Sequence, residues 1–359
     1  MNIKLKYLNI ISMANIISVS KADKLLRDNK LEEALFAYEK ILQKQPQNVR
    51  VLNNLGSLYR RTGRLEEAIN KYNEAISLDS NYLEIYYNRA NAYRDNGDYE
   101  NAFIDYEFII NSGLNLSGAY MGLAVICQFW GQYGDAQLHY LKAIELDPEN
   151  LTFYSAMLFA MTHNPKIDKE VLYSHHVNYQ KKIKKAENLI DIDALNIKSI
   201  NIGFVSADLY HHAVSFFIAP IFSSLKDFKN INVHVFSNTE KIDDVTKKLM
   251  ANVHSWSNVN NLDDDQFFEL IRKLKIDILI DLSGHTFGNR LSVFANRAAP
   301  IQISWIGYPG TTGLDNMDYV IADNYYEKTS LYTMSLETQV QKLIKEDKNG
   351  HFQITDWKD

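Results

Sequence analysis

A repeat of 34 residues is the feature that most restricts how this chain can fold. Between residues 15 and 150, an alanine, a tyrosine and a turn residue return at that spacing in four successive copies. The alanines are Ala34, Ala68, Ala102 and Ala136, the tyrosines are Tyr38, Tyr72, Tyr106 and Tyr140, and the turn positions hold Asn29, Gly63, Gly97 and Gly131. Small residues let two helices approach closely, and glycine or asparagine accepts the backbone of a tight turn. Each copy is therefore predicted to form two packed helices joined by a turn.

The spacing and the residue types are typical of tetratricopeptide repeats. The four copies are residues 15–48, 49–82, 83–116 and 117–150. They are expected to stack into a right-handed superhelix with a concave face. Cys127 lies in one of the packing columns, so we expect it to be buried. It is the only cysteine in the chain, which excludes an intrachain disulfide.

Two asparagines point to a binding groove in this superhelix. Asn54 and Asn88 occupy the same helix position one repeat apart, where a side chain is expected to face the concave side. Amide side chains can hold a peptide backbone through a paired donor and acceptor, so we predict a protein or peptide acceptor there. Ser20 and Gly122, at the same position of the outer repeats, do not extend the pair. The alternative is that both asparagines simply face water, because the fold alone does not identify a partner.

Residues 151–198 are predicted to connect the repeats to a second domain. A capping helix is expected from Leu151 to His163 and a polar helix from Asp168 to Lys185. Adjacent residues do not share a helix face. His175 and His176 are therefore a poor pair of metal ligands, and we expect them in solvated or capping roles.

Residues 199–323 alternate apolar strands with helices, which predicts a parallel sheet covered on both faces, a Rossmann-like α/β lobe. The expected strands are 199–205, 231–236, 276–282, 300–306 and 317–322, and the expected helices are 214–225, 243–251, 263–274 and 288–298. Loops rich in His, Gly, Thr and Pro follow several of these strands. A ligand crevice is expected at the carboxyl edge of such a sheet.

Charge and missing motifs argue against several functional classes. The formal charge of −6 disfavours nucleic-acid binding, because phosphate contacts require a basic surface. No run approaches the ~20 apolar residues of a membrane span. Asparagine and serine interrupt the semi-apolar run from Leu8 to Val19 that follows Lys4 and Lys6, so we expect a cytoplasmic protein without membrane contact. The lobe has no dinucleotide or phosphate-loop fingerprint, no nucleophile elbow and no HExxH spacing, so neither a cofactor nor a metal is predicted.

Three segments of the lobe carry distinctive motifs: Val205–Phe217 (VSADLYHHAVSFF), Asp281–Arg290 (DLSGHTFGNR) and Ala299–Gly313 (APIQISWIGYPGTTG). In this order after the repeats, they resemble the N-terminal catalytic lobe of the O-GlcNAc transferase, or SPINDLY-like, family. That family joins tetratricopeptide repeats to a two-lobed GT-B region, and its enzymes are inverting and metal-independent. The resemblance implies a protein O-glycosyltransferase that moves a sugar from a UDP-sugar, a substrate rather than a cofactor, to Ser or Thr.

The resemblance also implies roles for single residues. His212 matches a histidine beside the sugar donor and the acceptor, which suggests a base, and a histidine near its ordinary pKa suits proton transfer. The Pro-Thr that follows it in animal enzymes is Ala213-Val214 here, so hydroxyl contacts from that position are lost. His285 stands where family members carry His or Tyr, and its expected catalytic contribution is placement more than proton transfer. The positions matched to the lining of the donor sugar are Gly288, Ile306 and Gly307, continued by Pro309, Gly310 and Thr311 of the Gly-Pro-rich loop.

In the same family a second lobe holds most of the nucleotide, and it needs roughly 150–200 further residues. Residues 324–359 do not resemble it and form an atypical tail, with a helix expected at 335–345 and a short strand at 351–355. We therefore expect a truncated chain that transfers little sugar unless a second lobe is supplied. The alternatives are a half-enzyme completed by another chain and a tetratricopeptide interaction module with a vestigial catalytic lobe.

Overall fold

The computed structural model describes residues 18–184 and 199–322, together with the short segments 344–346 and 352–354. Contacts within the chain divide it into two compact units, one ending at Pro148 and the other beginning at Glu149. The first three residues of the predicted repeat array, the end of the connector and most of the tail lie outside the described residues.

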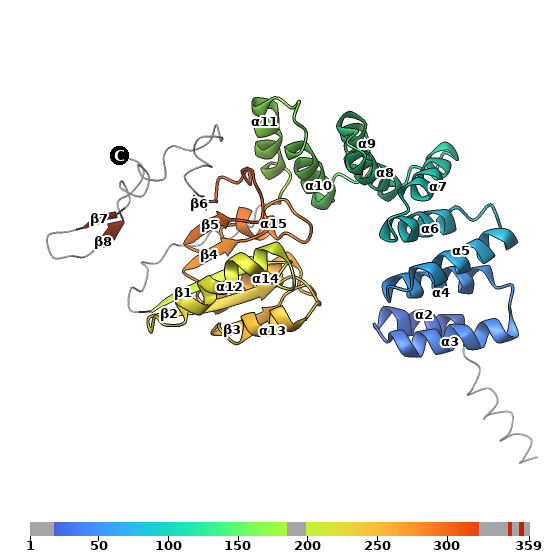
Figure 1. Cartoon of the computed structure of the whole chain (residues 1–359), viewed down its shortest axis with the longest axis horizontal. Helices are drawn as coiled ribbons and strands as arrows, with labels where there is room; N and C mark the ends of the chain where they lie inside the picture. The colour runs from blue at the N-terminus through green and yellow to red at the C-terminus, as the bar shows by residue number, and fades with distance from the viewer. Residues whose placement is uncertain (1–17, 185–198, 323–343, 347–351, 355–359) are drawn as a thin grey trace, which may run out of the picture. The chain divides into compact units, whose positions relative to one another are not determined.

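The first unit consists of helix pairs, one pair for each predicted repeat (Figure 1). The pairs are α2 (Val19–Arg27) with α3 (Leu31–Lys44), α4 (Val49–Arg61) with α5 (Leu65–Leu78), α6 (Leu83–Asp95) with α7 (Tyr99–Asn111), and α8 (Ser117–Phe129) with α9 (Tyr133–Leu146). The tetratricopeptide architecture predicted from the 34-residue period is confirmed.

The columns that define the period form the core of this unit. The four alanines and four tyrosines of the two columns are buried. A Cβ added to Gly56 would lie 2.6 Å from Cε1 of Tyr72, so only glycine admits the ring there. At the turns, Gly63, Gly97 and Gly131 have φ values of 77°, 78° and 73°, and Asn29 has φ 58°. Glycine adopts this left-handed region without strain and asparagine tolerates it. Cys127 is a buried free thiol, as expected.

A buried ion pair joins the two helices of the third repeat. Arg89 on α6 donates from Nε and Nη2 to the two carboxylate oxygens of Asp105 on α7, at 2.8 and 2.7 Å. The Asp105 side chain is 5% exposed. Paired hydrogen bonds of this kind fix the geometry as well as the charge. The third repeat is therefore held by a polar contact as well as by its apolar columns.

The second unit contains a helical pair and a doubly wound α/β lobe. The pair is α10 (Leu151–Thr162) and α11 (Lys169–Gln180), so the polar helix is shorter than predicted. The strands of the lobe are β1 (Ile200–Ser206), β2 (Ile231–Ser237), β3 (Ser255–Asn258), β4 (Ile278–Asp281), β5 (Ile301–Trp305) and β6 (Tyr319–Ile321). The helices of the lobe are α12 (Ala213–Leu225), α13 (Asp244–Met250), α14 (Asp264–Lys273) and α15 (Leu291–Ala295).

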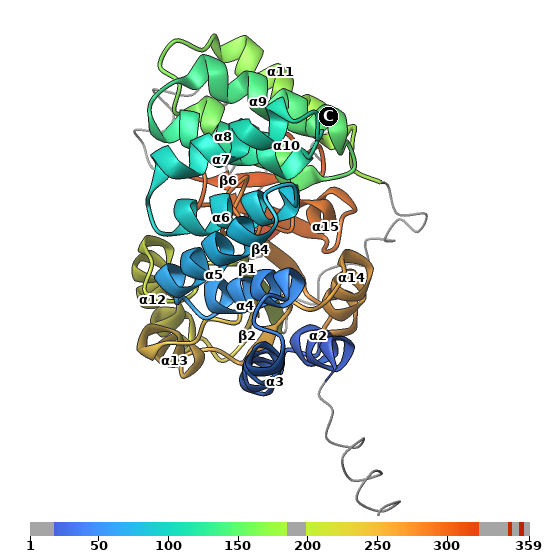
Figure 2. The ribbon, with the colours of Figure 1, turned by 90° about the vertical axis from the view of Figure 1, so that its right-hand side faces the viewer.

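All pairs in the main sheet are parallel, in the order β3-β2-β1-β4-β5-β6. In Figure 2, α12 and α13 lie on one side of this sheet and α14 and α15 on the other. This arrangement follows from right-handed crossovers that run outward from β1 and then restart at β4. The predicted parallel sheet with helices on both faces is confirmed.

Three details differ from the sequence predictions. Strand β3 was not predicted, because Ser255–Asn258 is short and polar and lacks the apolar run of a buried strand. Helix α15 is much shorter than the predicted 288–298, since the residues before it belong to a loop. Residues 344–346 form β7, paired antiparallel with β8 (Phe352–Ile354), where the end of a helix had been expected.

Candidate functional site

The order of the sheet locates the candidate crevice. The crossovers reverse direction between β1 and β4, and ligands of doubly wound folds bind outside the carboxyl ends of the strands at such a reversal. The loops that leave β1, β4 and β5 there are the three segments that carry the family resemblance. The structure therefore brings together, at one edge of one sheet, motifs that are spread over residues 205–313 of the sequence.

His212 leaves the first of these loops as the N-cap of α12. Its Nδ1 accepts a hydrogen bond from the backbone N–H of Val214 at 3.3 Å. In the neutral ring the proton then resides on Nε2, because Nδ1 is used as an acceptor. This tautomer makes Nε2 a hydrogen-bond donor. The predicted role as a base stays a prediction, and it requires Nδ1 to give up the cap.

Asp208 lies in the same loop and interacts with His212 and Tyr210. Burial raises the pKa of its carboxyl, against the charge of His212 and a hydrogen bond from Tyr210. The sequence motif contains Asp208, but without the fold nothing distinguished it from an ordinary loop aspartate.

The loop after β4 is pinned at its start by a buried carboxylate. Asp281 is fully buried and accepts hydrogen bonds from the backbone N–H of Ser283 at 3.0 Å and of Gly284 at 2.8 Å. Burial raises the pKa of Asp281 to about 6, although both hydrogen bonds act in the opposite direction. The chain therefore turns sharply at the end of β4 around one side chain.

Gly288 brings this loop against the loop that follows β1. It has φ 74°, and an added Cβ would lie 2.7 Å from Cβ of Ala207. Its carbonyl accepts a hydrogen bond of 2.8 Å from Nδ2 of Asn238, which follows β2. A side chain at Gly288 would separate the first two loops of the crevice. Its predicted contact with the donor sugar is not tested by these contacts.

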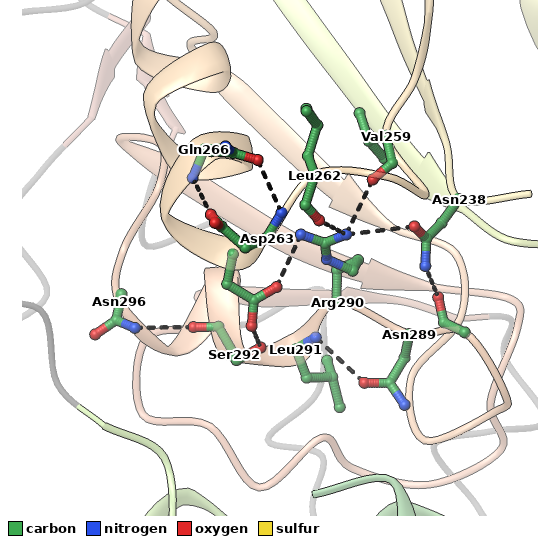
Figure 3. A network of polar contacts seen from close by, with 12 residues as sticks. Asn238, Val259, Leu262, Asp263, Gln266, Asn289, Arg290, Leu291, Ser292 and Asn296 are labelled. Carbon is green, nitrogen blue, oxygen red and sulfur yellow. Dashed lines mark hydrogen bonds and ion pairs between the residues drawn. The ribbon is translucent and has the colours of Figure 1, made fainter. Parts of the chain in front are cut away.

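Arg290 anchors the same loop from inside the lobe (Figure 3). Its Nη1 donates to Oδ1 of Asn238 and to the carbonyls of Val259 and Leu262, at 3.3, 3.1 and 3.0 Å. Its Nη2 lies 2.8 Å from a carboxylate oxygen of Asp264. The same Asn238 side chain thus holds Gly288 and contacts Arg290. In the sequence Arg290 is the last residue of the second motif, and no role was predicted for it.

The loop after β5 begins with strained backbone. Ile306 has φ 63°, a value that is unusual for a β-branched residue and that often marks a functional site. A Cβ on Gly307 would lie 1.8 Å from the carbonyl oxygen of Leu282, so the β5 loop rests on the backbone of the β4 loop. Pro309 is exposed, and Thr311 uses its Oγ1 to accept a hydrogen bond from the N–H of Gly313. Donor contacts at these residues and at Gly310 stay predictions.

His285 lies in a closed internal network and not on an open surface. It is 1% exposed. Its Nε2 donates to the carbonyl of Thr312 at 2.9 Å, and its Nδ1 accepts from Oγ of Ser155 at 3.1 Å. Burial and the neighbouring His176 lower its pKa to about 3. With both nitrogens engaged, His285 has no free group for a substrate, and the geometry assigns it to loop placement.

His176 is a correction to the sequence analysis, because it is neither solvated nor a cap. Its Nδ1 donates to the carbonyl of Leu172 at 2.8 Å, and its Nε2 accepts from the hydroxyl of Tyr308 at 2.7 Å. Burial lowers its pKa to about 4. The rings of His176 and His285 lie 5.2 Å apart. Together these contacts join α10 and α11 to the β4 and β5 loops.

The two groove asparagines use their amide nitrogens within the repeats. Nδ2 of Asn54 donates to Asp23 at 2.8 Å, and Nδ2 of Asn88 donates to Oδ1 of Asn53 at 3.0 Å. No hydrogen bond to either side-chain oxygen occurs within the described part of the repeat unit. Each side chain therefore keeps its oxygen as an acceptor for a peptide N–H, while its amide nitrogen, which carries two N–H groups, already donates within the repeats. Peptide binding at these positions stays a prediction.

The described ranges contain neither a membrane-spanning helix nor a candidate metal site. No helix there is long and apolar enough to cross a membrane. Nor does that part of the chain contain a group of three or more His, Cys, Asp or Glu side chains placed to hold a metal ion.

Comparison with known proteins agrees with the architecture. The sequence model of Glycosyl transferase family 41 matches residues 153–343, more than half of the chain. Tetratricopeptide models match residues 37–70, 56–97 and 117–150.

Individual relatives cover the same regions. The probable UDP-N-acetylglucosamine–peptide N-acetylglucosaminyltransferase SPINDLY of Oryza sativa subsp. japonica is 34% identical over 193 residues, 52% of this chain and 21% of that protein. The UDP-N-acetylglucosamine–peptide N-acetylglucosaminyltransferase of Caenorhabditis elegans is 34% identical over 142 residues, 38% of this chain and 12% of that protein. The solved structure of a mutant O-GlcNAc transferase of Thermobaculum terrenum superposes with a TM-score of 0.56 and 25% identity, over 85% of this chain and 52% of that one. The matched region thus spans about a fifth of the rice protein and about half of the Thermobaculum protein.

Proposed function

Since this chain belongs to glycosyl transferase family 41, we propose that its α/β lobe takes part in transferring a sugar from a UDP-sugar to Ser or Thr hydroxyls of proteins. The observation that carries the proposal is the convergence of the β1, β4 and β5 loops at the reversal point of the sheet. The names of the relatives point to N-acetylglucosamine as the sugar.

The reaction requires two forms of assistance. The acceptor hydroxyl oxygen forms a bond to the anomeric carbon, the bond from that carbon to the phosphate oxygen breaks, and the hydroxyl proton passes to a phosphate oxygen of the departing UDP or to water. UDP departs with additional negative charge, which hydrogen-bond donors stabilise. A group that accepts the proton typically contributes a factor of ~10²–10⁴.

We propose that His212 acts in this reaction through Nε2. As long as Nδ1 caps α12, Nε2–H donates to an oxygen of the donor or the acceptor. The N-terminal end of α12 adds partial positive charge beside the same ring. Acting as the base instead would require His212 to release the N–H of Val214. The proposed lining of the sugar, Gly288 with the backbone of Ile306 and Gly307, then supplies a surface without bulky side chains.

We further propose that the repeats deliver the protein acceptor, with the free oxygens of Asn54 and Asn88 receiving its backbone N–H groups. The described lobe forms one side of a two-lobed site, so we propose that a second lobe supplies the main grip on the UDP moiety. The proposed location of the protein is cytoplasmic, and no nucleic acid or resident cofactor is part of the proposal.

The test is transfer of radiolabelled N-acetylglucosamine from UDP-GlcNAc to a Ser/Thr peptide, with and without a second lobe supplied in trans. His212→Asn is the informative variant, because asparagine is also a good N-cap and keeps the acceptor for the backbone of α12. The matched control is His211→Ala, since His211 is exposed and adjacent.

We expect His212→Asn to keep the stability of the native chain and to lose transfer by about a hundredfold or more, the effect of losing one well-placed hydrogen-bond donor. His211→Ala should stay within about threefold of the native rate. Native transfer by His212→Asn would remove His212 from the mechanism. A complete lack of transfer by the native chain under both conditions would refute the enzymatic proposal itself.

A further inference from the structure

Aromatic rings gather in the second half of the repeat unit, two of them exposed and two half-buried. Tyr99 and Phe103 lie on α7, Phe129 ends α8, and Trp130 follows it; we call these four residues the aromatic edge. Phe129 is 65% exposed and Trp130 40%. The ring centroids of Tyr99 and Phe129 are 4.2 Å apart, and those of Phe103 and Trp130 are 5.3 Å apart. Large rings at this exposure mark a binding surface more often than isolated surface residues do.

The charge around this edge differs from that of the rest of the repeats. Residues 83–148 carry nine Asp or Glu and three Lys or Arg, a net charge of −6. Residues 15–82 carry nine Asp or Glu and eleven Lys or Arg, a net charge of +2. The acidic character therefore belongs to the two repeats that contain the aromatic edge.

Three exposed acidic residues lie on α7 and α9 of the same two repeats. Glu100 is the neighbour of Tyr99, and Glu107 follows Phe103 by one helical turn on α7. Asp135 on α9 and Glu107 both act on the buried thiol of Cys127, where they add to the effect of burial in raising its pKa, so the two carboxylates flank the same part of α8. Within the described residues Glu100, Glu107 and Asp135 take part in no ion pair. Their charge is available to an incoming cation.

We propose that the aromatic edge binds an arginine-bearing segment of a protein partner. A guanidinium is planar, stacks on aromatic faces and pairs with carboxylates, so it satisfies both features of this surface at once. An uncharged apolar segment would leave the carboxylates unused, and a nucleic acid would be repelled by them. This surface would recognise an arginine side chain of the partner, whereas the oxygens of Asn54 and Asn88 are proposed to bind its backbone N–H groups. The inference does not depend on sugar transfer, because it concerns binding alone.

Fluorescence anisotropy of the full chain tests this binding without any donor sugar. The probe is a fluorescein-labelled peptide of alternating Arg, Gly and Ser, and two matched probes carry Lys or Glu in place of Arg. We expect the Arg probe to bind tightest, the Lys probe more weakly and the Glu probe not at all. Added sodium chloride should weaken binding of the Arg probe, since exposed charges are screened by salt.

The variants Phe129→Ala and Trp130→Ala should each weaken binding of the Arg probe by about two- to fivefold, the range of an exposed cation–π contact. Phe36→Ala is the matched control: Phe36 is 58% exposed on α3, in the half with net charge +2. The Phe36 ring also already has a cation over it, because Nζ of Lys40 lies 5.5 Å from the ring centroid. Because all three side chains are exposed, circular dichroism should show unchanged helix content.

Two results would overturn the proposal. One is equal binding of the Arg and Glu probes. The other is an Arg probe whose affinity falls no further in Phe129→Ala and Trp130→Ala than in Phe36→Ala. Neither outcome bears on whether the lobe transfers a sugar, so failure of this proposal and of the enzymatic one can be told apart.

Discussion

Mild acid should destabilise the second unit through His176 and His285, two of its buried histidines. His176 and His285 keep pKa values of about 4 and about 3 in the folded lobe, because burial disfavours the imidazolium, against an ordinary value of 6.5. The unfolded chain therefore binds more protons than the folded chain as the pH falls below 6.5. Stability present at neutral pH is lost as the pH falls from 6.5 toward 4 and 3.

The size of the effect follows from these pKa values. At pH 5 an unfolded histidine lies 1.5 pH units below its pKa of 6.5. At about 1.36 kcal/mol per unit, each buried histidine then costs about 2 kcal/mol and the pair about 4 kcal/mol. Asp281 opposes them, because its folded pKa of about 6 lets the folded state take up a proton first, which restores about 1.4 kcal/mol at pH 5. The net expectation is a lobe about 3 kcal/mol less stable at pH 5 than at pH 7.5.

Urea unfolding at the two pH values measures this difference. Trp256 and Trp305 lie on strands β3 and β5 and report on the lobe, and Trp130→Phe removes the tryptophan of the repeats. His176→Gln should lower stability at pH 7.5 and shrink the pH difference from about 3 to about 1 kcal/mol. His163→Gln, an exposed histidine of the same unit, should leave the difference unchanged. The reasoning is refuted if native stability is the same at both pH values, or if His176→Gln keeps the full difference.

Three further changes test packing at the site and in the repeats. Gly307→Ala should destabilise the lobe by about 3 kcal/mol or block folding, because the new methyl overlaps a backbone carbonyl. The control is Gly310→Ala, which should cost under ~1 kcal/mol because its nearest neighbour is a movable ring at 3.0 Å. Equal urea midpoints for the two variants would contradict the close approach at Gly307. Arg290→Met should cost about 2–3 kcal/mol and speed hydrogen exchange of its loop, and native exchange rates would show that the loop does not need this anchor. Asp105→Ala should destabilise the repeat unit by about 3 kcal/mol, since it leaves a partly buried guanidinium without its carboxylate. The exposed ion pair of Lys142 with Glu145 on α9 offers the control. Glu145→Ala should change stability by no more than ~0.5 kcal/mol, and similar losses for both variants in far-ultraviolet circular dichroism would argue against a buried pair.

The repeats could be predicted closely from the sequence because every packing position recurs in each repeat and can be compared between copies. A residue such as Tyr72 recurs in three other copies, so periodicity separates packing positions from surface positions. The long apolar strands of the lobe were predictable for a related reason, since a strand buried on both faces needs an unbroken apolar run. Strand β3 has no such run and depends on the neighbouring β2 for its pairing.

The internal network of the lobe could not be predicted, because its members are far apart in the chain. His176 meets Tyr308 across 132 residues, and Ser155 meets His285 across 130. Adjacent histidines on a polar helix give no local sign of which one will be buried. Arg290 offered a weak sign, a charged residue between a glycine-rich loop and a buried helix. For the site itself the motifs identified the loops, but which nitrogen of His212 faces outward followed only from the helix cap.

The anchoring of the β4 loop has a consequence for how the site can change. Arg290 fixes that loop through contacts made behind it, with the carbonyls of Val259 and Leu262, so the loop's outward residues contribute little to its position. Phe287, only three residues earlier, is 86% exposed. Such a residue can be exchanged for one of another size or charge without moving the backbone beneath it. Substitutions at exposed positions such as Phe287 can therefore change which ligands the crevice accepts, while the contacts of Arg290 keep the loop backbone in place.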